Sequence, residues 1–138
     1  MLMPKALSTV SLAAILALAT AAGAAPTQSL SGHWSGVVGQ SGPGVKPLQY
    51  VASLTLNGDS GTMDYPTLEC GGDVAFVSRS AAGYVYRETL SHGQGCLGGG
   101  TITVQPSASS VYWRWDGAGV TASGRLYRVA ATPPPARH

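Results

Sequence analysis

The chain has 138 residues, 10% of them charged, and a formal net charge of +2 at pH 7. Its Lys and Arg residues occur singly, so it lacks the basic stripe of a nucleic-acid-binding protein and the polybasic cluster of a membrane-surface protein. Its His and Cys residues show none of the paired short spacings of a structural zinc site. We therefore expect no nucleic-acid partner, no metal and no cofactor.

Residues 1–24 have the composition of a secretory signal peptide that is cleaved. Lys5 precedes an apolar stretch from about Ala6 to Ala19, and Ala22-Gly23-Ala24 matches an A-x-A cleavage site. The apolar stretch is shorter than the roughly 20 residues that span a bilayer. Removing Lys5 leaves seven cations against six carboxylates. We expect an exported chain, periplasmic or extracellular, without stable membrane insertion after cleavage.

The remaining sequence has no helical periodicity, and turn signals recur about every 8–12 residues, as in all-β proteins. The clearest strand pattern runs from Leu48 to Asn57, where apolar residues alternate with mostly polar ones. Asn57-Gly58 is a strong hairpin signal, and Pro66 ends the next strand because it cannot donate to a ladder. The expected strands are 32–39, 48–57, 61–66, 73–80, 84–91, 100–106, 111–116 and 120–129.

Eight short strands with short connections predict an all-β fold, an eight-stranded antiparallel up-and-down barrel within residues 25–130. Closure of the sheet leaves no exposed edge. An interior of this size holds packed side chains or one small ligand. A two-sheet β-sandwich is the alternative. Residues 131–138 contain three consecutive prolines and are expected to form a disordered tail.

Cys70 and Cys96 are the two cysteines of the chain, and such a pair in an exported protein predicts a disulfide. Glycines 93, 95 and 98 around Cys96 match the G-x-G-x-x-G pattern of dinucleotide-binding loops. In such a loop a helix follows the glycines, whereas here a strand pattern follows them. We therefore interpret the stretch as a disulfide corner.

The disulfide interpretation makes a geometric prediction about the hairpin of the fourth and fifth strands. With a turn near Ala82, Asp73 is expected opposite Ser91, and Cys70 near Gln94. Cys96 is then two residues from the position opposite Cys70, close enough for a bridge.

Glu88 is the carboxylate that stands out in the expected strands. It shares one strand face with Tyr84, Tyr86 and Leu90. If that face points inward, Glu88 is a buried acid that needs a partner. An ion pair with Arg79 or Arg114 is expected, and a ligand-anchoring group or a general acid are the alternatives.

Two tryptophans share a face of the seventh strand, Trp113 and Trp115, together with Val111. Such an inward face fills a core or lines a pocket for an apolar or sugar ligand. The candidate ligand-lining residues are therefore Tyr84, Tyr86, Glu88, Trp113 and Trp115.

The two ends of the barrel sequence carry a family resemblance. Gly32 and Trp34 form a G-x-W motif at the start of the first strand, and Arg125 and Arg128 lie at the end of the last. This resembles the lipocalin-type (calycin) barrels. The resemblance implies that Trp34 closes one end of the barrel and that Arg128 or Arg125 packs across its ring, with Trp34 and Arg128 as the barrel-closing pair.

The middle of the chain is similar to a group of small exported bacterial domains with no established activity. Four motifs carry this resemblance in order: Tyr65-Pro66, Cys70-Gly71-Gly72, Tyr86-Arg87-Glu88 and Cys96-Leu97-Gly98-Gly99.

These observations predict an exported, non-enzymatic binding protein. It would hold a small apolar ligand inside the barrel, or another exported protein through its loops. The first alternative is a protein inhibitor or immunity-type protein that acts on a hydrolase. The remote alternative is a hydrolase that uses Glu88 or His92. No G-x-S-x-G nucleophile motif is present, so no catalytic residue is assigned.

Overall fold

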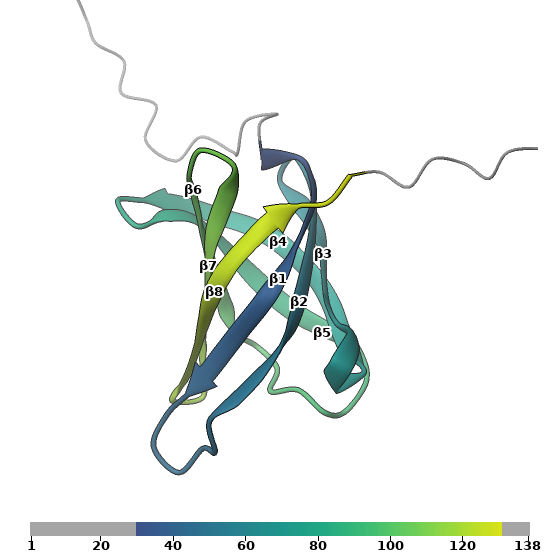
Figure 1. Ribbon diagram of the computed structural model, residues 1–138, viewed down its shortest axis with the longest axis vertical. Helices are drawn as coiled ribbons and strands as arrows, with labels where there is room; N and C mark the ends of the chain where they lie inside the picture. The colour runs from purple at the N-terminus through teal and green to yellow at the C-terminus, as the bar shows by residue number, and fades with distance from the viewer. Residues whose placement is uncertain (1–29, 131–138) are drawn as a thin grey trace, which may run out of the picture.

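Eight strands follow one another around a closed antiparallel barrel in the computed structural model, which describes residues 30–130 (Figure 1). β1 pairs with β2 on one side and with β8 on the other, so the sheet has no edge and the sandwich alternative is excluded. The predicted all-β up-and-down barrel is confirmed. The strands are β1 (Gly32–Ser41), β2 (Leu48–Asn57), β3 (Ser60–Tyr65), β4 (Cys70–Ser80), β5 (Gly83–His92), β6 (Thr101–Pro106), β7 (Ser110–Gly117) and β8 (Val120–Arg128).

The expected signal peptide, residues 1–24, and the expected tail, residues 131–138, lie outside the described residues. A short 3-10 helix, η2 (Pro66–Leu68), connects β3 to β4. Within residues 30–130 no helix is long and apolar enough to cross a membrane.

The predicted strand boundaries differ most from the structure at β4, which begins at Cys70 and not at Asp73. Gly71 and Gly72 still pair with β3, opposite Asp64 and Met63. The sequence predicts a loop at this glycine pair. The pair instead lies in the ladder, where the backbones of the two neighbouring strands come too close to leave room for a Cβ.

The predicted register of the β4–β5 hairpin is wrong by two residues. Asp73 lies opposite Thr89, not Ser91. Two causes add together. The tight turn joins Ser80 to Gly83, so its centre lies before Ala82, which shifts the strand pairing by one residue. A bulge at Val77 shifts the pairing by one more residue.

The interior of the barrel is filled by the inward-facing residue of each alternating pair. The largest side chains with almost no exposure include Trp113, Tyr86, Leu54, Met63 and Ile102. The middle of the barrel is therefore a packed core, and its two ends differ in structure.

β1 begins and β8 ends at the same end of the barrel (Figure 1). Trp34 lies there, opposite Arg128 in the ladder, and its side chain is buried. Its indole N–H donates to the Leu30 carbonyl at 3.0 Å, and the Arg128 guanidinium lies 4.2 Å from the ring centroid. Arg128 also donates to the Ser31 carbonyl at 2.8 Å. Of the two candidate arginines, Arg128 is therefore the one that packs across the Trp34 ring. Arg125 instead donates to the Ser110 hydroxyl at 3.2 Å.

Candidate functional site

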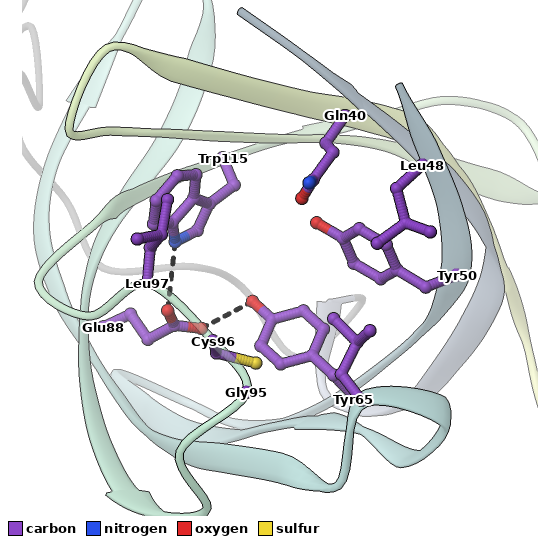
Figure 2. A pocket seen from close by; sticks show the side chains of 10 residues that line it. Gln40, Leu48, Tyr50, Tyr65, Glu88, Gly95, Cys96, Leu97 and Trp115 are labelled. Atoms are coloured by element: carbon purple, nitrogen blue, oxygen red, sulfur yellow. Dashed lines mark hydrogen bonds between the residues drawn. The ribbon is translucent and has the colours of Figure 1, made fainter. Parts of the chain in front are cut away.

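A pocket of about 100 Å³ opens at the other end of the barrel (Figure 2). Its walls come from the end of β1, the start of β2, the end of β3, η2, the inner part of β5, the loop before β6 and the end of β7. The lining residues are Gln40, Leu48, Tyr50, Tyr65, Leu68, Glu88, Gly95, Cys96, Leu97 and Trp115.

Strand alternation places the pocket's aromatic and acidic side chains. On β2, Tyr50 takes the inward positions together with Ala52 and Leu54, and on β3 Tyr65 does so together with Met63. On β5 the inward face carries Tyr84, Tyr86 and Glu88, which the sequence predicts to share a face. Side chains from strands far apart in sequence therefore meet inside one closed sheet.

Glu88 is 1% exposed, and both of its carboxylate oxygens accept hydrogen bonds. The Tyr65 hydroxyl donates to Oε2 at 2.6 Å, and the Trp115 indole N–H donates to Oε1 at 3.0 Å. Figure 2 shows both bonds meeting at the carboxylate. A distance of 2.6 Å is typical of a hydroxyl that donates to an ionised carboxylate.

The expected ion pair between Glu88 and Arg79 or Arg114 is absent. Arg114 forms a bidentate pair with Asp116, at 2.8 and 3.0 Å, on the outer face of β7. The Arg79 guanidinium lies 5.1 Å from the centroid of the Tyr84 ring, towards the β4–β5 turn. The expectation failed because strand alternation places Arg114 outside the sheet while its neighbour Trp115 points inward.

Arg114 and Asp116 also line a hollow of about 330 Å³ on the outer surface of β6 and β7. Its charged groups already pair with each other and are well exposed. The smaller end pocket is the stronger candidate because it encloses a buried carboxylate.

Burial governs the protonation of the pocket. It raises the pKa of Glu88 above the ordinary value of 4.5, while the hydrogen bonds from Tyr65 and Trp115 act in the lowering direction. Burial and the charge of Glu88 raise the pKa of Tyr50 to about 12. Burial, followed by the charge of Glu88 and the bond to it, raises the pKa of Tyr65. Both tyrosines therefore keep their hydroxyl protons throughout the physiological range.

Two glycines allow Trp115 to reach Glu88. A Cβ on Gly100 would overlap the indole ring, and a Cβ on Gly117 would lie 2.8 Å from it. The Gly100 carbonyl also accepts the Glu88 backbone N–H at 3.0 Å. The loop before β6 therefore lies directly against the Trp115 ring because Gly100 has no side chain.

The disulfide between Cys70 and Cys96 is present, with a Cα–Cα distance of 6.2 Å. It ties the loop before β6 to the start of β4, and Cys96 itself lines the pocket. Gly93 passes so close to this corner that a Cβ there would lie 2.6 Å from the Cys70 Cα, and its φ is +82°. The predicted disulfide corner is confirmed, and it forms one wall of the pocket.

The other candidate ligand-lining residues lie elsewhere. Glu88 and Trp115 line the pocket, whereas Tyr84, Tyr86 and Trp113 are buried in the core. The Tyr86 hydroxyl and the Trp113 indole N–H are buried without a hydrogen-bond partner in residues 30–130.

His92 lies outside the pocket, on the surface near the start of β4. Its Nε2 is 3.6 Å from Asp64 Oδ1, and its Nδ1 is 3.4 Å from the Ser91 hydroxyl. This order of groups is similar to a Ser-His-Asp triad. The contacts are long, however, and the His92 and Asp64 side chains are 60% and 53% exposed, so this group is open to water within residues 30–130. Among the residues that the structure describes, no group of three or more His, Cys, Asp or Glu is placed to hold a metal.

Sequence reasoning missed Tyr65, Tyr50 and Gln40 as parts of this site. Tyr50 had a usable signal, because it lies on the inward face of the clearest alternating strand. Tyr65 occupies the last position of β3, where a two-residue period is hard to read. Gln40 had no signal, because it lies beyond the predicted end of β1.

Comparisons of the chain with protein-family models, with curated proteins and with solved structures find no match.

Proposed function

We propose that this protein is an exported, non-enzymatic binding protein, akin to the lipocalin-type barrels, and that the end pocket is its ligand site. The observation that carries the proposal is the buried Glu88 carboxylate, held by Tyr65 and Trp115 at one end of the barrel, next to a core of buried side chains. Binding sites commonly combine apolar walls with a few placed polar groups. Export is supported by the leader composition and by the disulfide, which persists in oxidising compartments.

The size of the pocket restricts the ligand. A volume of about 100 Å³ is smaller than the roughly 150 Å³ that holds a benzene molecule, and well below the roughly 300–1,000 Å³ of pockets for drug-sized ligands. The pocket therefore suits a small head group. That group is either a small molecule or the end of a longer chain that extends out of the barrel.

The experiment is a screen of small neutral, cationic and anionic compounds, read by the indole N–H resonances of the three tryptophans in a ¹⁵N-labelled protein. A ligand in the pocket should shift the Trp115 signal, because that N–H bonds to Glu88. The Trp34 signal is the internal control, because its N–H bonds to Leu30 at the other end. If no compound moves Trp115, or if Trp34 moves equally, the pocket is not a ligand site.

An inhibitor or immunity-type protein is the second candidate, supported by the pocket rim. Leu48 and Leu97 are 43% and 50% exposed there and could contact a protein partner. A purified hydrolase that binds the protein should lose affinity for the Leu97→Asp variant. The control is Val77→Asp, an exposed apolar position near the β4–β5 turn. Equal losses in both variants would contradict a role for the rim.

A further inference from the structure

The charge of Glu88 has no counter-ion in the described part of the chain. Its polar contacts there are the Tyr65 hydroxyl and the Trp115 indole N–H, which are both neutral. Among the residues that the structure describes, no Lys, Arg or His lines the pocket. A buried carboxylate is costly unless it is paired, and two neutral donors offset only part of that cost.

The free hydrogen-bonding capacity of the pocket favours a ligand that donates. The two donors next to Glu88 are both used by its carboxylate, which has about four acceptor positions and two bonds. The side chains of Gln40 and Tyr50 make no hydrogen bond within residues 30–130, and their polar ends point into the same space as the carboxylate (Figure 2). The Glu88 carboxylate offers acceptors alone, whereas Gln40 and Tyr50 each offer an acceptor as well as a donor, so a donating ligand can bond to all three.

The walls of the pocket suit a cation with an aliphatic stem. The rings of Tyr50, Tyr65 and Trp115 line it, and electron-rich aromatic rings attract cations. Leu48 and Leu97 at the rim are half-exposed and apolar, which suits the methylene stem of an amine or guanidine. An anionic ligand would instead meet the buried charge of Glu88 at close range.

We propose that the end pocket binds a small organic cation, a guanidinium or primary ammonium group, with Glu88 as its counter-ion. This inference rests on the proposed function and specifies its ligand class. The cation supplies the missing charge, its N–H groups reach the free acceptors of Glu88, Gln40 and Tyr50, and its stem leaves past Leu48 and Leu97.

The test compares methylguanidinium with methylurea, which have nearly the same shape but differ in charge. Methylguanidinium should shift the Trp115 indole N–H resonance in a saturable titration, and methylurea should bind at least about tenfold more weakly. The Glu88→Gln variant should lose at least about tenfold in affinity for methylguanidinium. Glu69→Gln makes the same chemical change at an exposed carboxylate outside the pocket and should leave the affinity unchanged.

A second measurement needs no variant. Methylguanidinium keeps its charge at all accessible pH values, and the lining groups that titrate besides Glu88 are Tyr50 and Tyr65, whose raised pKa values keep them neutral in acid. Affinity for methylguanidinium should therefore fall as acid protonates Glu88. An affinity that does not change between pH 8 and pH 4 would overturn the inference.

The outcomes separate this inference from the proposed function. If methylurea binds as well as methylguanidinium, the pocket is a ligand site but not a cation site. If an uncharged compound alone moves Trp115, the conclusion is the same. If no compound of any charge moves Trp115, both proposals fail.

A cation of this class has two sources, a free small molecule and an Arg or Lys side chain of another protein. Arginine blocked at both its amino and carboxyl groups tests them. If it binds more tightly than methylguanidinium, the source is a protein side chain, because the flanking groups gain contacts at the rim. If blocking abolishes binding while agmatine binds, the source is a free cation.

Discussion

Replacing Tyr65 with Phe should destabilise the barrel by about 2 kcal/mol at a pH above the pKa of Glu88. The substitution keeps the ring and removes only the hydroxyl that donates to Glu88 at 2.6 Å. A hydrogen bond to a charged group contributes roughly 1.5–3 kcal/mol, and the carboxylate is left with the Trp115 bond alone. In a barrel of about 100 residues, this loss should lower Tm by about 10 °C.

The penalty of Tyr65→Phe should shrink in acid. Below its pKa, Glu88 is neutral, and a hydrogen bond between neutral groups contributes only about 0.5–1.5 kcal/mol. The Tyr65 bond lowers the pKa of Glu88, so its removal raises that pKa further above the ordinary value of 4.5. The difference in unfolding free energy between wild type and variant must therefore grow as pH rises through the pKa of Glu88.

Urea unfolding at several pH values, followed by tryptophan fluorescence, measures this difference. Tyr86→Phe is the matched control, because Tyr86 is also buried but its hydroxyl has no partner in the described residues. Its effect should be within about 0.5 kcal/mol of zero or stabilising, since the buried hydroxyl loses no bond. Equal penalties for the two variants, or a Tyr65→Phe penalty that is independent of pH, would refute the reasoning.

Three further variants test the ends of the barrel and its charge. Burial raises the pKa of Glu88 in the folded state above its ordinary value of 4.5. The stability that Glu88 contributes is therefore fully present below about pH 4.5 and is lost as pH rises through the raised pKa. Glu88→Gln should abolish that loss, so its unfolding free energy relative to wild type should rise over this window; a constant difference would contradict the burial argument. Arg128→Met keeps an aliphatic stem near Trp34 but removes the charge over its ring, and thermal melting should show a loss of about 1 kcal/mol; an unchanged Tm would show that the contact is not stabilising. Replacing Cys70 and Cys96 with Ser opens a loop with a sequence separation of 26 residues and should cost about 3.5 kcal/mol in the chain-entropy model. That double variant should also lose cation binding at the pocket wall, and an unchanged affinity would show that the disulfide does not shape the site.

Local patterns were enough to predict the strands, because inward and outward positions alternate with a period of two. The pattern of Leu48–Asn57 matches β2 at both ends. The same alternation correctly placed Glu88 on one face with two tyrosines, and the structure shows that this face points inward. It could not reveal the bulge at Val77, because a single extra residue shifts the register without leaving a compositional signal.

The sequence by itself determined the barrel class and the disulfide, because the number of strands follows from local alternation and turn spacing, and the bridge from a pair of cysteines. It placed Glu88 on one face with two tyrosines but left open whether that face points inward. Only the tertiary structure decided what Glu88 contacts. Tyr65 is 23 residues before it and Trp115 is 27 residues after it, and no local period links them. The pocket exists because closing the sheet brings β3, β5 and β7 around one space, and because Gly100 leaves room for the Trp115 ring.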